Sequence, residues 1–150
     1  MNYEKYSDYR YTDDYSVFVF VSTGKKGAIP KKIIFTYRPT ELGNFYNLAF
    51  GDVNENGKLD DYIISNNGDR NKILATIFTV VDLYTKKYPE RWIVFRGSTN
   101  ERTRLYRIAI GLNLEELCQI FEIYVYTEEG LKPFCKNMEV NVFVIKRKKD

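Results

Sequence analysis

The sequence contains no histidine at all, and it has only two cysteines and four prolines among its 150 residues. Without an imidazole, neither a Ser-His-Asp triad nor a histidine-based ribonuclease pair can be assembled. Any chemistry would have to use Asp, Glu, Lys, Tyr, Arg or Cys. Cys118 and Cys135 lack metal-type spacing, and a structural zinc site has no histidine to draw on. We therefore expect two free, buried or half-buried thiols, no metal site and no cofactor.

Long hydrophobic runs are also missing. The longest early one, Val17 to Val21, is far too short to cross a bilayer. The first residues, MNYEKYSDYRY, contain no apolar stretch of the signal-peptide kind. We therefore expect a cytoplasmic protein that has no membrane partner.

Aromatic residues are abundant, with 13 Tyr and 10 Phe. Tyrosine favours half-buried sheet surfaces, where the ring is dry and the hydroxyl is wet, so this excess favours β structure. A length of 150 residues with 44% hydrophobic residues is enough for one continuous core. We expect a single domain over residues 1–150.

Two periodicities organise the chain. Period-two alternation predicts one hairpin from residues 15–21 and 28–37 around STGKKG, and another from 45–53 and 59–65 around NENGK. Helical spacing predicts helices over 69–88 and 98–112, the second with Leu105, Ile108, Ala109 and Leu112 inward, and a short helical turn at 113–116. RWIVFRG and two final strands, FEIYVY and MEVNVFVIKRK, complete the set. The prediction is an α+β fold: a mainly antiparallel sheet built from hairpins, with two principal helices packed on one face.

The segment DVNENGKLD, residues 52–60, has the spacing of oxygen ligands in a calcium loop. An EF-hand needs a glutamate at the twelfth position, where this sequence has Ile63, and both flanks are predicted strands. The segment also looks like one FG-GAP repeat of the integrin-type propellers, but those folds need several copies. The preferred interpretation is a hairpin turn whose Asn and Asp side chains bond their own backbone, and a weak calcium site is the alternative.

A secondary polar cluster is predicted around the start of the first helix. It comprises Asp52, Asp61, Asn67, Asp69 and Lys72. The segment NNGDRNK is typical of a turn followed by a helix cap. Asp61, Asp69 and Lys72 could alternatively form a nuclease-like metal site.

The segment GSTNERTRLY is the most informative, because a helix is predicted to begin directly after a buried strand. Free N–H groups and the positive end of the helix dipole would then attract an anion. Arginine binds phosphate in a bidentate fork. The candidate phosphate site comprises Gly97, Ser98, Thr99, Arg102, Arg104 and Tyr106.

A structural explanation of the same residues stays open. Ser98 and Glu101 have the spacing of a capping box, which by itself accounts for a hydroxyl and an acid at a helix start. The arginines could be solvated, or one could pair with an aspartate, since five acidic residues lie between Asp52 and Asp69.

Three segments, FGD at Phe50 to Asp52, NNGDRNK at Asn66 to Lys72 and GSTNERTRLY at Gly97 to Tyr106, carry a resemblance. Together they make the chain resemble a family of uncharacterised bacterial proteins of about 150 residues. The resemblance implies a single bacterial domain and no particular catalytic residue.

Two functional classes follow. Seven basic and two acidic residues lie between Lys86 and Arg107, and KRKK follows near the end of the chain, although the net charge is only +3. Basic residues interspersed with tyrosines suit nucleic acid or a nucleotide, bound without catalysis at GSTNERTRLY. The alternative is a protein partner, in a bacterial toxin–antitoxin or defence system, bound through exposed tyrosines and sheet edges. An enzyme is the least favoured class.

Overall fold

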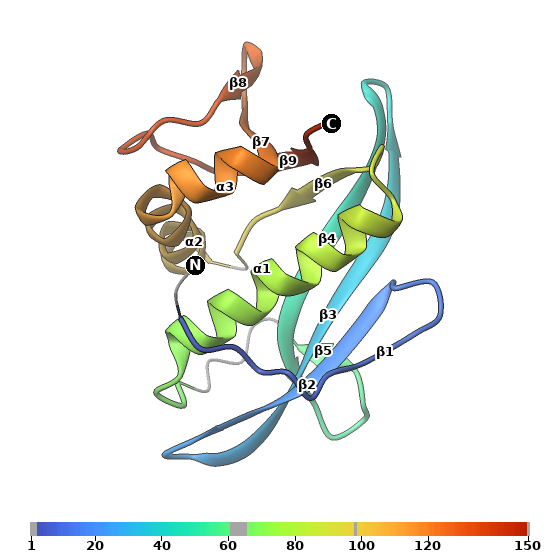
Figure 1. Ribbon diagram of the computed structural model, residues 1–150, viewed down its shortest axis with the longest axis vertical. Helices are drawn as coiled ribbons and strands as arrows, with labels where there is room; N and C mark the ends of the chain where they lie inside the picture. The colour runs from blue at the N-terminus through green and yellow to red at the C-terminus, as the bar shows by residue number, and fades with distance from the viewer. Residues whose placement is uncertain (1–2, 61–65, 98, 150) are drawn as a thin grey trace. The chain divides into compact units, whose positions relative to one another are not determined.

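The computed structural model describes residues 3–60, 66–97 and 99–149. It shows three helices and a nine-stranded, mostly antiparallel sheet, which confirms the predicted α+β class (Figure 1). The strands follow the order β1-β2-β3-β4-β6-β9-β7-β8, with β5 paired to β4. Within the described ranges, no helix is both long enough and apolar enough to cross a membrane.

The elements have the following bounds. The helices are α1 (Arg70–Lys87), α2 (Asn100–Leu112) and α3 (Leu114–Ile120). The strands are β1 (Arg10–Tyr11), β2 (Val17–Gly24), β3 (Gly27–Thr40), β4 (Gly43–Val53), β5 (Leu59–Asp60), β6 (Trp92–Phe95), β7 (Phe121–Thr127), β8 (Gly130–Pro133) and β9 (Phe143–Arg147).

The chain forms two compact units. Unit 1 comprises residues 1–35 and 49–84, and unit 2 comprises residues 36–48 and 85–150. Strands β3 and β4 each begin in one unit and end in the other. The backbone therefore passes between the units several times.

Unit 1 is built on the β2–β3 hairpin, as the alternation of its sequence predicts. Strand β2 pairs antiparallel with β3 from Gly24 opposite Gly27 to Val17 opposite Ile34. Alternate residues are buried, and Phe35 of β3 stacks on Tyr84 of α1 with ring centroids 3.8 Å apart. The apolar stripe of α1 therefore covers the buried face of this hairpin.

Unit 2 contains a pairing that the hairpin pattern did not predict. Strand β4 runs parallel to β6, with Phe45 opposite Trp92, and β6, β9, β7 and β8 then pair antiparallel. Residues Gly130 to Pro133, predicted as a connection, form strand β8. Residues 138–142, predicted as strand, precede β9. One face of these strands is a continuous apolar surface formed by Ile93, Phe95, Phe121, Ile123, Val125, Phe143 and Ile145.

Helices α2 and α3 lie on the same side of the unit 2 strands (Figure 1). The Tyr106 ring of α2 meets Phe95 edge-on at 6.0 Å, so this side is the apolar one. The prediction that Ile108 and Leu112 point inward was wrong, because they are 41% and 71% exposed. Ala109 is buried as predicted, and Thr103, Ile110 and Gly111 are buried in place of Ile108 and Leu112.

Candidate functional site

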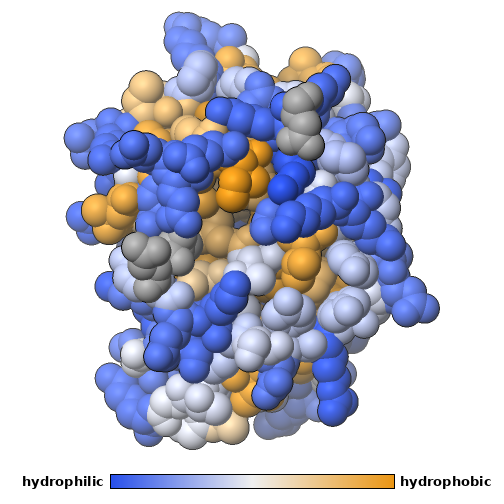
Figure 2. Space-filling view, viewed as in Figure 1, coloured by the Kyte–Doolittle hydropathy of each residue, from blue (hydrophilic) through white to orange (hydrophobic). Residues whose placement is uncertain are grey.

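The side of the molecule shown in Figure 2 is mainly hydrophilic, with hydrophobic residues in small patches. The segment Gly97 to Tyr106 belongs to unit 2, where β6 ends and α2 begins. Thr99 is the N-cap of α2, with extended backbone angles, and its hydroxyl accepts a hydrogen bond from the Arg102 N–H at 3.2 Å. The predicted capping residue, Ser98, lies outside the described residues, and the cap function belongs to Thr99.

Gly97 is required here by close packing. Its N–H donates to the Thr103 hydroxyl at 3.0 Å, and the same hydroxyl donates to the Thr99 carbonyl at 3.1 Å. A Cβ atom on Gly97 would lie 2.4 Å from the Arg102 Cβ. The buried Thr103 therefore rotates α2 away from the predicted inward face. The N–H groups of Gly97 and Arg102 both bond within the protein, so neither of these two groups is available to an anion.

The arginines around this helix start differ in exposure. Arg96 and Arg104 are exposed, whereas Arg102 is half-buried. Arg107 is also half-buried, and its Nη1 donates to the Met138 carbonyl at 3.2 Å, which ties α2 to the loop before β9. Arg107 therefore stabilises the fold. The charged groups of Arg96 and Arg104 are exposed to solvent. Arg102 lies between them in the sequence and is less exposed than either.

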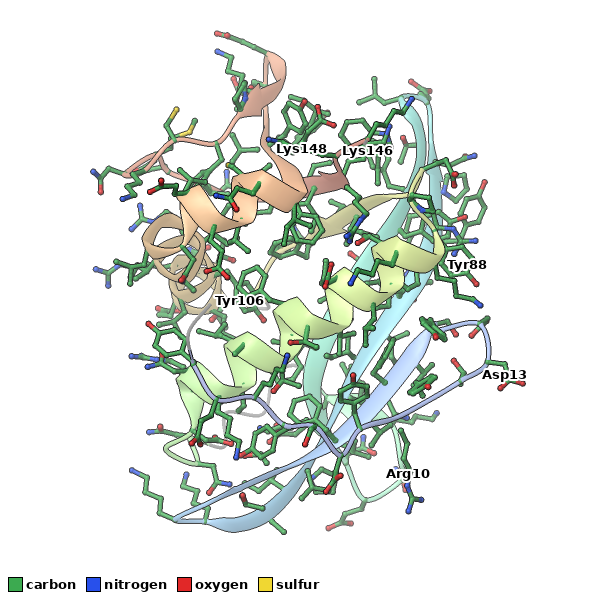
Figure 3. The ribbon with its side chains drawn as sticks, viewed as in Figure 1. Arg10, Asp13, Tyr88, Tyr106, Lys146 and Lys148 are labelled. Carbon is green, nitrogen blue, oxygen red and sulfur yellow. The ribbon has the colours of Figure 1, made fainter. Side chains whose placement is uncertain are left out.

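Tyr106 is labelled in Figure 3, where it lies beside α2. Its ring is half-buried and packs on Phe95. Of the predicted phosphate site, the helix start brings together Gly97, Thr99 and Arg102. Arg104 is exposed and lies two residues further along α2, so its side chain and that of Arg102 do not face each other. Tyr106 packs on Phe95 and supports the helix from its inner side.

The secondary polar cluster lies in unit 1, and the structure brings three of its residues together at the start of α1. The Asn67 side chain accepts from the Lys26 N–H at 2.6 Å and donates to the Gly27 carbonyl at 2.9 Å. It also donates to the Ser22 hydroxyl at 3.1 Å. Asn67 is only 3% exposed, so this buried amide fixes the turn between β2 and β3.

Asp69 continues the same network. Its Oδ2 accepts from the Ser22 hydroxyl at 2.6 Å and from the Tyr6 hydroxyl. Its Oδ1 is buried with no hydrogen-bond partner among the described residues. Lys72 Nζ lies 4.2 Å from the centroid of the Tyr6 ring. An open pocket of about 570 Å³ adjoins this cluster, lined by Tyr3, Glu4, Asn66, Gly68, Asp69, Arg70, Asn71 and Lys72.

Asp52 and Asp61 do not join that cluster in the described structure. Asp52 forms a buried ion pair with Lys31, and their side chains are 8% and 5% exposed. Asp61 lies outside the described residues. In the part of the chain that is described, no group of three His, Cys, Asp or Glu side chains could hold a metal ion.

The segment DVNENGKLD forms a turn between β4 and β5. Asn54 Oδ1 accepts from the N–H groups of Asn56 and Lys58, both at 3.0 Å, and Gly57 has a φ of +75°. The predicted turn is confirmed, and Asn54 bonds its own backbone as expected, whereas Asp52 pairs with Lys31 instead. Cys118 and Cys135 are both free thiols, as expected, although Cys135 is exposed rather than buried.

A further group of side chains, which the sequence analysis did not single out, lies on the face of the unit 2 strands opposite the helices. We call it the aromatic face and define it by Phe45, Trp92, Tyr124, Tyr126 and Lys146. Phe45 and Trp92 are opposite each other, with ring centroids 6.4 Å apart, and Trp92 and Tyr124 are 5.7 Å apart. Lys146 Nζ lies 5.2 Å from the centroid of the Trp92 ring.

The alternation in FEIYVY could have revealed this face. It places Glu122, Tyr124 and Tyr126 on one side of β7, opposite the buried Ile123 and Val125. The Tyr124 hydroxyl donates to Glu122 Oε1 at 3.2 Å. Burial raises the pKa of this hydroxyl above its ordinary value, and the Glu122 carboxylate adds to the rise. Tyr124 therefore stays neutral at physiological pH, and its hydroxyl donates a hydrogen bond to the Glu122 carboxylate.

Comparison with curated proteins and with solved structures found no match to this chain. Comparison with protein families matched residues 2–148 to a family of unknown function designated DUF6934. The match includes the α2 start, the polar cluster of α1 and the aromatic face. The chain is therefore a member of the family of unknown function DUF6934.

Proposed function

We propose that the protein binds a phosphate-bearing ligand, a nucleic acid or a nucleotide, at the start of α2 and without catalysis. The observation that supports this most is the concentration of arginines there. Arg96 and Arg104 are exposed, Arg102 is half-buried, and Glu101 is the one acidic residue between them in sequence. Guanidinium groups bind phosphate oxygens through paired, charge-assisted hydrogen bonds.

Each residue of the predicted site that the structure describes has a role in this proposal. Arg102 and Arg104 supply the phosphate contacts. Thr99 caps the helix and so fixes where those side chains begin, and Gly97 allows the first turn of α2 to pack against the end of β6. Tyr106 holds the helix on the sheet through Phe95. The phosphate contacts thus come from guanidinium groups on a helix that is held in place by its cap and its packing.

The experiment is a binding measurement with matched arginine variants. A single-stranded oligonucleotide of about ten nucleotides is titrated against wild type, Arg104→Ala and Arg38→Ala. Both arginines are exposed and both changes remove one charge, but Arg38 is on β3. We expect Arg104→Ala to weaken binding about ten-fold or more, because a hydrogen bond to a charged group contributes about 1.5–3 kcal/mol. Equal binding by the two variants would refute the assignment to α2.

A protein-binding function is the second candidate, and one observation favours it. Tyr126 of β7 and Leu131 of the edge strand β8 are opposite each other and are 49% and 37% exposed. Edge strands with exposed apolar side chains are suited to pairing with another chain. If the protein belongs to a toxin–antitoxin or defence system, co-expression with the product of an adjacent gene should give a complex. The double change Tyr126→Ser, Leu131→Ser should then dissociate it in size-exclusion chromatography.

A further inference from the structure

We propose that the aromatic face of unit 2 binds a single strand of nucleic acid by stacking bases on its rings. This inference rests on the function proposed above for the class of ligand, but it uses residues that the α2 site does not contain. It places a contact for the bases on the face of the unit 2 strands that is opposite α2.

The aromatic face is the open side of the unit 2 strands. The register puts Trp92 and Val94 of β6, Val144 and Lys146 of β9, and Tyr124 of β7 on this side. The alternate residues Ile93, Ile145 and Ile123 lie on the side that contacts the helices. Phe45, Trp92 and Tyr124 are half-buried and Tyr126 is 49% exposed, so their rings are accessible.

The arrangement of the rings suits unpaired bases. Phe45, Trp92 and Tyr124 come from three strands, and each ring is within 6.4 Å of the next. Every base has a π-face, so a row of aromatic side chains binds a single strand with little dependence on sequence. The bases of a duplex are stacked on each other, so they are not available to such a row.

The charges on and beside this face complement a phosphate backbone. Lys146 lies over the Trp92 ring, and Lys148 follows two residues later and is exposed. Figure 3 labels both lysines, which lie near each other at the end of the chain. The nearby carboxylate, Glu122, accepts the hydrogen bond of Tyr124. Two lysines beside the rings therefore favour a polyanion over an uncharged apolar partner.

Trp92 makes this proposal directly measurable, because it is the only tryptophan in the chain. Its fluorescence is recorded while oligothymidylate or oligouridylate of about ten nucleotides is added. Stacking of a base on or beside the indole should quench this fluorescence, and the DNA and RNA strands distinguish the two sources of the ligand. The same DNA strand in a duplex should quench little.

Matched variants separate stacking from general charge effects. Tyr126→Ala on the aromatic face is compared with Tyr37→Ala on β3, because the two tyrosines are 49% and 48% exposed. We expect Tyr126→Ala to weaken single-strand binding roughly five-fold or more and Tyr37→Ala to leave it unchanged. Lys146→Gln should also weaken binding. Tyr124→Phe, which keeps the ring and loses only the hydroxyl, should bind as wild type does.

The outcomes distinguish this inference from the α2 proposal. Quenching by a single strand, together with equal binding of that strand by Arg104→Ala and Arg38→Ala, would support the aromatic face and refute the α2 site. Binding that depends on Arg104 but leaves Trp92 fluorescence unchanged would overturn the aromatic face alone. A Trp92 response to a partner protein, with none to either single strand, would overturn this inference in favour of a protein interface.

Discussion

At the residue scale, the fold around α2 depends on one glycine. Gly97 has neighbouring atoms where a Cβ would be, with the Arg102 Cβ at 2.4 Å and the Thr103 N at 2.5 Å. A methyl group cannot fit unless the first turn of α2 moves, and the Gly97 hydrogen bond to Thr103 would move with it.

We therefore expect Gly97→Ala to lower the free energy of unfolding by about 1–3 kcal/mol, as overpacking does. Gly111→Ala is the control, because a Cβ there meets only Lys136 Cγ at 3.8 Å. Alanine is favoured over glycine inside a helix, so the control should be neutral or stabilising. Urea denaturation of both variants measures their free energies of unfolding. Equal values for the two variants would show that α2 does not pack closely on Gly97.

Asp14 gives a prediction about pH. Its carboxylate accepts from the Ser16 hydroxyl at 2.7 Å, from the Ser16 N–H at 3.0 Å and from the Thr12 hydroxyl at 2.8 Å. These bonds, with Ser16 as the main cause, lower the pKa of Asp14 from 3.8 to about 2. The pKa is lower in the folded state, so the turn is stabilised above pH 3.8 and loses this contribution as pH falls toward 2.

An NMR titration of side-chain carboxyl groups should give Asp14 a midpoint near 2 in wild type. In Ser16→Ala the midpoint should move up toward 3.8, because the hydroxyl donor is lost. An unchanged midpoint in that variant would show that Ser16 is not the cause.

At the residue scale, sequence alone predicted some roles and missed others. The turn chemistry of Asn54 and Gly57 was predictable, because both residues act on their own backbone. The burial of Thr103 was not, because it depends on close packing against Gly97, which lies in the connection between β6 and α2. The exposure of Cys135 was missed because its burial was expected from its apolar neighbour Phe134. Phe134 is indeed buried, but the Cys135 side chain is exposed.

At the element scale, the buried ion pair between Lys31 and Asp52 connects β3 and β4, which are neighbours in the sheet. A charge left alone in such a position is costly, whereas replacing both charges by apolar groups of similar size is often tolerated. This pair therefore constrains which residues can occupy the two strands, even though its net contribution to stability is small.

We expect Asp52→Ala to destabilise the protein by about 3–5 kcal/mol, because it breaks a buried ion pair by removing one of its members. The double change Lys31→Met, Asp52→Leu should recover most of that loss. Chemical denaturation of the single and double variants tests this. A single variant as stable as wild type would mean that Lys31 reaches water once Asp52 is removed.

The elements themselves were predictable where their signal is local. Alternation predicted the β2–β3 hairpin and helical spacing predicted α1, because each pattern lies within one continuous stretch. The parallel pairing of β4 with β6 was not predictable in this way, because it joins residues that are far apart in the chain. Strand β8 was missed because Gly130 and Pro133 at its ends are typical of connections.

At the scale of the whole molecule, the chain divides into two compact units that share the long strands β3 and β4. We still expect one domain, because neither unit is a continuous stretch of chain. The candidate sites are distributed between the units: the pocket of α1 is in unit 1, and the α2 start and the aromatic face are in unit 2.

The site was predicted less completely than the fold. Arginines near a helix start are visible in the sequence, so Arg102 and Arg104 could be named. Whether the N–H groups beside them are free depends on side chains such as Thr103, and that became visible only in the structure. The aromatic face combines residues from four strands, so no single motif contains it.

The salt dependence of oligonucleotide binding tests the central claim most directly. Each phosphate contact releases counterions, so the slope of log affinity against log salt reports how many contacts are made. The account predicts a steep negative slope for wild type and for Arg38→Ala, and a slope shallower by about one for Arg104→Ala. A slope near zero in wild type, or identical slopes for Arg104→Ala and wild type, would contradict phosphate recognition at α2.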